Sequence, residues 1–218
     1  MISEEEKDRI RSIVSNVSPE LAKNYKRVET FIDKPFNLPE IDPIRYEICY
    51  CLLFSLNQAS ITLTNHLLEK YLKIALVYRE VETIGHLTLD ESSSIFEETI
   101  KKYNKNLDTT INLCCSKGII TKEEKKILNQ VREKFRNAFS HADSEKTFGD
   151  LTIPVTQGSL SKPTEFSTKV FFVKNYPMAQ GIVQKQMADL VAFDYFVFAD
   201  KLIRNSIVKI FPDLYSHN

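Results

Sequence analysis

The chain has 218 residues, with 29 Lys and Arg against 29 Asp and Glu, so its formal net charge is zero and no overall field attracts it to nucleic acid or to an anionic membrane. A hydrophobic share of 43% with 27% charged residues is typical of a soluble globular protein and excludes a disordered chain. This length favours one domain, residues 1–218, with a sizeable core. The first eleven residues are acidic and polar, unlike a signal peptide, and we expect a cytoplasmic protein.

Glycine and cysteine usage excludes several kinds of cofactor site. The five glycines are never closer than nine residues, the spacing of Gly149 and Gly158, so neither a dinucleotide-binding fingerprint nor a P-loop occurs. The four cysteines form no C-x-x-C pair and the four histidines are scattered, which gives a zinc site no support. We expect no cofactor, no metal, and reduced, mostly buried thiols.

Two capping signals and three prolines organise residues 1–43. Ser3 and Glu6 form a capping box, and Ser18-Pro19-Glu20 is typical of a second helix start that runs to about Phe31. Three prolines between Asp33 and Pro43 then predict an extended connector. We expect an N-terminal helical pair followed by this connector.

A helical core is predicted from residue 44 to residue 146. Neither Gly nor Pro occurs between Ile44 and about Arg79, which predicts one long or kinked helix. Residues 48–68 carry no Lys, Arg, Asp or Glu, a length that raises the question of a membrane span. Eight polar side chains in that run favour a helix buried in a bundle, so we expect no membrane association.

Shorter helices follow, and the segment before the last helix differs from the rest. Residues 91–103 and 107–117 read as helices, with Gly118 as a C-terminal stop, and Thr121 with Glu124 caps a helix that is predicted to end near His141. Residues 147–177 hold two β-prone runs and predict a small β-hairpin or an irregular insertion. A final helix is predicted from about residue 178 to residue 210. The predicted helical core therefore comprises residues 44–146 and 178–212. The fold class is therefore mainly α.

The residues that carry chemistry follow the capping box of Thr121. Arg136 and Asn137 stand next to each other, and His141 lies four residues after Asn137, on the same face of a helix. The Asn137 amide is placed to orient the imidazole or to bind a phosphate beside it. An Arg that neutralises a phosphate beside a His that moves protons suits cleavage of RNA by its own 2′-hydroxyl, without a metal.

This motif resembles the HEPN superfamily, which is marked by Arg, a polar residue, a few further residues and His on a helix of a small bundle. The pattern of residues 65–73 also resembles that family's earlier helix. The resemblance implies a HEPN-like helical bundle and a metal-independent endoribonuclease. It implies a homodimer with the motif at the interface, so that two copies of Arg136, Asn137 and His141 form one catalytic site on RNA. The products would carry a 2′,3′-cyclic phosphate and a 5′-hydroxyl.

The family also implies a biological setting and one departure from it. The resemblance implies that the protein is a toxin or a phage-defence effector, and that an antitoxin or a regulatory protein is a possible partner. In one toxin branch a nucleotide-accepting Tyr stands two residues after the His, but here that position is Asp143, which speaks against that regulation. The carboxylate either repels RNA or raises the pKa of the His.

Other interpretations stay open. The alternative function is a non-catalytic HEPN-like module that binds RNA or a protein, and a helical scaffold with a chance motif is a third. Glu69 and Lys73 border the substrate cleft or form a solvated i,i+4 ion pair. The polar residues Asn65 and His66 are expected to be satisfied within a buried helix. The aromatic residues of the last helix are expected to pack in the core or in a dimer interface. The vicinal Cys114 and Cys115 are expected to be packing residues.

Overall fold

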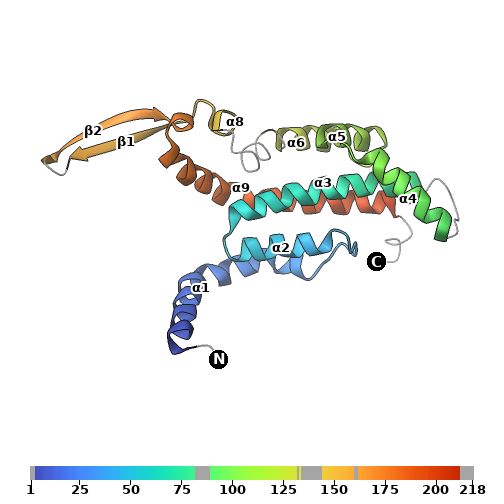
Figure 1. The fold of residues 1–218 in the computed structure, drawn as a ribbon, viewed down its shortest axis with the longest axis horizontal. Coiled ribbons are helices and arrows are strands. Elements are labelled where there is room, and N and C mark those ends of the chain that lie inside the picture. The colour runs from blue at the N-terminus through green and yellow to red at the C-terminus, as the bar shows by residue number, and fades with distance from the viewer. Residues whose placement is uncertain (1–2, 82–88, 132, 134–143, 160–161, 212–218) are drawn as a thin grey trace.

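The protein is mainly helical, with one small antiparallel sheet before the last helix (Figure 1). The structure is a computed structural model, and it describes residues 3–81, 89–131, 133, 144–159 and 162–211. Two long helices, α3 (Asn57–Val81) and α9 (Pro177–Ile210), run side by side through the middle of the molecule. The mainly α fold with a hairpin before the last helix is the predicted one.

The N-terminal segment is one helix, α1 (Glu4–Ile32), and the predicted helical pair is wrong. The capping box is present as expected, since the Glu6 backbone N–H donates to Ser3 Oγ at 3.2 Å and the Ser3 N–H donates to Glu6 Oε2 at 2.7 Å. Pro19 lies inside this helix, where proline removes one hydrogen bond and bends the axis without always ending the helix. Figure 1 shows α1 changing direction partway along its length.

The apolar stretch after the connector is divided into two separate helices, so the prediction of one long or kinked helix is also wrong. Helix α2 (Asp42–Leu53) has Phe54 as its C-cap, and α3 begins at Asn57. Ser55 between them has a φ of 57°, a left-handed conformation that non-glycine residues adopt only rarely. Asn24 of α1 holds this turn, because its Nδ2 donates to the Leu53 carbonyl at 3.1 Å and to Ser55 Oγ at 2.9 Å.

The three shorter helices begin close to their predicted positions: α4 (Leu89–Tyr103), α5 (Leu107–Ser116) and α6 (Lys122–Val131). Gly118 has a φ of 70° and its N–H donates to the Cys115 carbonyl, so it ends α5 as predicted. The second capping box is also present, with Thr121 Oγ1 accepting from Glu124 N–H at 3.1 Å. The predicted continuation of that helix to His141 falls outside the described residues.

The segment before the last helix forms a hairpin. The short helix α8 (Ser144–Phe148) leads into β1 (Thr152–Ser159), which pairs antiparallel with β2 (Lys162–Phe172). A 3₁₀ turn, η3 (Val173–Asn175), connects β2 to α9. The two strands pack mainly on each other and project from the bundle (Figure 1). Their base is anchored by Lys174, which pairs with Glu145 at 2.9 Å.

The core lies where α2, α4 and α5 pack on α3, and where α3 packs on α9. The aromatic residues of α9 belong to it, since Phe31 of α1 makes edge contacts with Phe193 and Phe196. Cys114 is fully buried, and its Sγ lies 3.4 Å from the Leu72 carbonyl oxygen that accepts from it. The packing role predicted for these residues is confirmed. Over the described part of the chain, no helix combines the length and apolarity needed to cross a membrane.

One charged cluster lies inside this core. Arg45 of α2 is fully buried and its Nε donates to Asp200 Oδ1 of α9 at 2.9 Å. Arg204 donates from its Nε to the other carboxylate oxygen, Oδ2, at 2.7 Å. Both guanidinium groups lie 4.9 Å from the centre of the Phe36 ring. The cluster joins the connector, α2 and α9, and a carboxylate shared by two cations satisfies part of the charge that burial would otherwise leave unpaired.

Candidate functional site

The three motif residues Arg136, Asn137 and His141 lie outside the described residues, as does Asp143. What the structure describes is the helix that precedes them in the chain. Helix α6 ends at Val131, five residues before Arg136, and Leu128 and Val131 line a small space together with residues of α3, α5 and α9. The end of α6 is therefore anchored in the bundle.

A polar contact from α3 to α9 lies at the same place. The Tyr195 hydroxyl of α9 donates to Asn65 Oδ1 of α3 at 2.7 Å, and burial raises the pKa of Tyr195 above its usual value. Asn65 Nδ2 and Asn129 Oδ1 of α6 are buried and have no hydrogen-bond partner among the described residues. The expectation for Asn65 is thus confirmed at one of its two polar atoms. For His66 it is wrong, because this side chain is exposed.

Glu69 and Lys73 are brought together on α3. Lys73 Nζ donates to Glu69 Oε1 at 3.1 Å, and both side chains are a little over a quarter exposed. This is the i,i+4 ion pair that the spacing indicates. Its contribution to stability is small at such exposure. Lys73 also lines a pocket.

That pocket lies where α3 and α4 meet and has a volume of about 330 Å³. Lys70 and Lys73 of α3 and Glu40 of the connector supply its charged groups. The rest of the lining is mostly apolar and aromatic: Ile74, Val77, Tyr78, Phe96, Ile100 and Tyr103. Sequence reasoning singled out Lys73 of this lining but not Glu40 or Tyr78, because these two are 38 residues apart and neither belongs to a motif.

A second charged cluster holds α4 and α5 against α3. Glu80 of α3 accepts from Lys102, from the Tyr103 hydroxyl at 2.5 Å and from Lys117 at 3.0 Å. These donors lower the pKa of Glu80 to about 2, with the Lys102 hydrogen bond as the largest cause. Because Tyr103 also lines the pocket, Glu80 fixes one of its walls.

Comparisons with protein-family models, with curated proteins and with solved structures found no match to this chain. The candidate sites therefore rest on the residues and on the geometry of the described elements alone.

Proposed function

We propose that this chain is a metal-independent endoribonuclease of HEPN type. The observation that carries the proposal is the sequence Arg136-Asn137 followed by His141, placed directly after a capped helix of a mainly helical protein. The anchoring of α6 against α3 and α9 supports it, because a catalytic segment needs a rigid base.

The proposed reaction is transesterification within the RNA backbone. A neutral His141 imidazole takes the proton from the 2′-hydroxyl, and the 2′-oxygen attacks the adjacent phosphorus. The bond from phosphorus to the 5′-oxygen breaks, and the protonated His141 of a second copy donates its proton to that leaving oxygen. Arg136 stabilises the added negative charge on the phosphate, and Asn137 orients the imidazole. The products are a 2′,3′-cyclic phosphate and a 5′-hydroxyl.

The reaction as proposed needs two copies of the motif, and therefore a homodimer. The described surface offers exposed apolar side chains on the first half of α9 for this contact: Met178, Ile182 and Leu190 are 80%, 63% and 78% exposed. Exposed apolar side chains that lie near one another are typical of a protein interface. In this proposal the protein acts in the cytoplasm as a toxin or defence effector, held in check by an antitoxin or regulatory partner.

The test is incubation of the purified protein with total cellular RNA in EDTA. We expect cleavage by the wild type and its loss in His141→Ala and in Arg136→Ala, with cyclic phosphates at the new 3′ ends. His66→Ala and Arg11→Ala are matched controls, because both side chains are exposed and lie outside the motif. Intact RNA with the wild type, or equal cleavage by the motif variants, would reject the proposal.

The second candidate is a non-catalytic module that binds RNA or a protein. The zero net charge favours the form that binds a protein, since most of the affinity of proteins for nucleic acid comes from cations that meet the phosphates. For the form that binds RNA, the expected result is RNA that the wild type retains but never cuts, with the retention lost in Arg136→Ala.

A further inference from the structure

The outer edge of β1 is interrupted by a proline. At the base of the hairpin the Val173 N–H donates to the Leu151 carbonyl, and hydrogen-bonded pairs alternate with non-hydrogen-bonded pairs along an antiparallel ladder. The register therefore makes Pro154 and Val170 a non-hydrogen-bonded pair, in which the backbone polar groups of both residues point away from the other strand. Because proline has no N–H, the outer edge of β1 lacks a donor at Pro154.

The outer edge of β2 has no such interruption beside Pro154. By the same alternation, the N–H and C=O groups of Thr168 and Val170 point away from β1. Within the ranges that the structure describes, no third strand pairs with either edge of this sheet. Both side chains are exposed as well, that of Val170 at 70%. A row of outward N–H and C=O groups is a template for another strand.

The hairpin also lacks the support that a two-stranded sheet needs. It projects from the bundle (Figure 1), and its strands pack mainly on each other. On one face the Phe171 ring stacks on Tyr176 at 5.4 Å, whereas Val170 and Phe172 on the opposite face are 70% and 45% exposed. A lone two-stranded hairpin is only marginally stable in water, and further strands stabilise it. A strand added along β2 supplies that stabilisation.

We propose that β2 pairs antiparallel with β2 of a second copy of this chain, so that two hairpins form one four-stranded sheet. Antiparallel pairing of a strand with its own copy is two-fold symmetric, and the same backbone groups serve on both sides. The outermost strand on each side is then β1, where Pro154 interrupts the row of donors. The pairing therefore closes at two chains and does not continue as a fibre.

Lys169 restricts the register of this pairing. Its side chain is exposed, and a two-fold axis through Lys169 would place two like charges directly opposite each other, which is destabilising. We expect the axis at Thr168, the adjacent position towards the middle of β2. Thr168 then forms a hydrogen-bonded pair with Thr168 of the second copy. On both sides of the axis Val170 pairs with residue 166 of the other chain.

Disulfide formation in Thr168→Cys tests this geometry directly. The Cα atoms of a hydrogen-bonded antiparallel pair lie about 5.5 Å apart, within the range of about 4.4–6.8 Å that a disulfide spans. We expect mild oxidation to link two chains at position 168, read by mass spectrometry of the linked peptide. Thr156→Cys is the matched control, because Thr156 stands opposite Thr168 on β1 and is also exposed. This variant and the wild type should not give a linked peptide from the hairpin.

A proline on each outer edge separates the two edges. In the Thr168→Cys protein, Val170→Pro should weaken the pairing about ten-fold or more, because both copies lose an outward N–H while the ladder to β1 keeps its bonds. Thr156→Pro makes the same change on the outer edge of β1 and should leave the yield of the link unchanged. The pair Thr152→Cys with Phe172→Cys checks the fold of the Val170→Pro hairpin, since these residues are opposite each other in the ladder.

This inference does not depend on the proposed endoribonuclease, because only paired hairpins link position 168 and no RNA is used. A protein that forms the link but does not cut RNA would reject the nuclease alone. Absence of the link at every protein concentration, including a dimer held by α9 alone, would overturn the hairpin pairing. So would an equal loss of the link in Val170→Pro and Thr156→Pro with the hairpin still formed, because the two edges would then not differ.

Discussion

At the scale of single residues, Asp200 carries more of the stability than its size suggests. Its two oxygens accept from Arg45 and Arg204, and the Arg45 side chain is fully buried. Burying a guanidinium removes its hydration, and the attraction to the carboxylate offsets that cost only while the pair is intact. The cluster also orders the connector, because Arg204 donates to the carbonyl of Lys34.

We expect Asp200→Asn to lower the free energy of unfolding by about 3–5 kcal/mol, because it leaves two guanidinium groups without a compensating charge. Urea unfolding followed by circular dichroism measures the change. Asp194→Asn, on the exposed face of the same helix, should change the free energy by no more than about 0.5 kcal/mol. A similar small effect of both substitutions would show that the buried pair contributes little.

At the scale of elements, Glu80 fastens α4 and α5 to α3 by an interaction that depends on pH. Its pKa in the folded protein is about 2, below its usual 4.5. The unfolded chain therefore takes up the proton first as the pH falls. The stabilisation is complete at pH values above about 5 and is lost between about 4.5 and 2.

Glu80→Gln tests this dependence. The difference in melting temperature between wild type and variant should be constant near neutral pH and should shrink as the pH falls from about 4.5 towards 2. Glu98→Gln, an exposed substitution on α4, should track the wild type at every pH. A difference that persists unchanged at pH 2–3 would mean that the charge of Glu80 is not what holds these helices.

The hairpin is a separable element. Its strands pack mainly on each other, and at its base the Val173 N–H donates to the Leu151 carbonyl at 2.9 Å while Thr152 pairs with Phe172. Replacing residues 153–171 by Asn-Gly joins that pair by a two-residue turn. We expect the shortened protein to keep its melting temperature within a few degrees, measured by scanning calorimetry. A collapse of the transition would show that the bundle needs the strands.

Local signals in the sequence predicted the elements well where a cap or a stop residue marked them. Ser3, Thr121 and Gly118 act as their types and positions indicate. The division between α2 and α3 was not predictable in this way, because Ser55 carries the left-handed turn without glycine and a side chain of another helix, Asn24, stabilises it. Tertiary contacts decide such a position.

The candidate sites also differ in whether local sequence signals or tertiary contacts determine them. The Glu69–Lys73 pair follows from helical spacing and is present. The motif at residues 136–141 stays a prediction. The pocket depends on Glu40 and Tyr78 meeting across two helices and a connector, and no sequence period links residues that the fold alone brings together.

At the scale of the whole molecule, the proposed dimer makes a prediction of its own. If the exposed apolar side chains of α9 form the contact, the double substitution Ile182→Glu and Leu190→Glu should convert a dimer into a monomer, because it places charges in an apolar interface. Light scattering after size-exclusion chromatography measures the mass. Val208→Glu, exposed near the other end of α9, is the control. A monomeric wild type would remove the two-copy site altogether.

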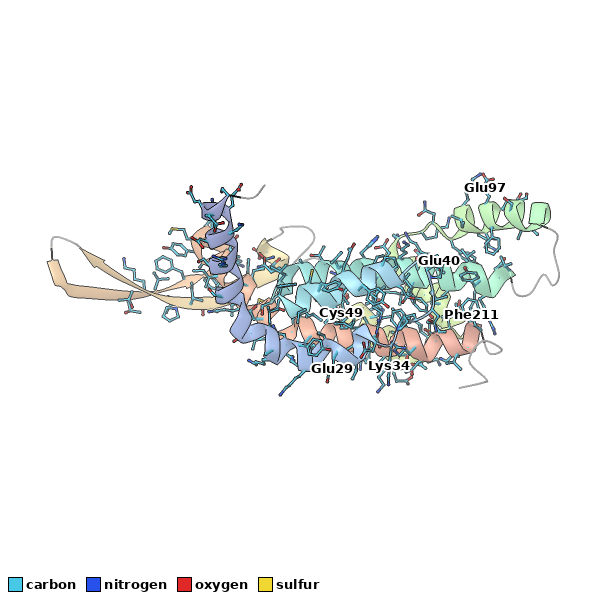
Figure 2. The ribbon with its side chains drawn as sticks, turned by 90° about the horizontal axis from the view of Figure 1, so that it is seen from below. Glu29, Lys34, Glu40, Cys49, Glu97 and Phe211 are labelled. Atoms are coloured by element: carbon cyan, nitrogen blue, oxygen red, sulfur yellow. The ribbon has the colours of Figure 1, made fainter. Side chains whose placement is uncertain are left out.

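The burial of two thiols gives the molecule its own reporters of motion. Burial raises the pKa of Cys49 on α2 to about 11 and that of Cys114 on α5 to about 12, so neither forms the thiolate that alkylating reagents attack. Each reacts only when its helix separates from the core, and the rate of labelling then measures the population of that opening. Figure 2 marks Cys49. Mass spectrometry of labelled peptides would thus measure, in one sample, a separate opening frequency for α2 and for α5.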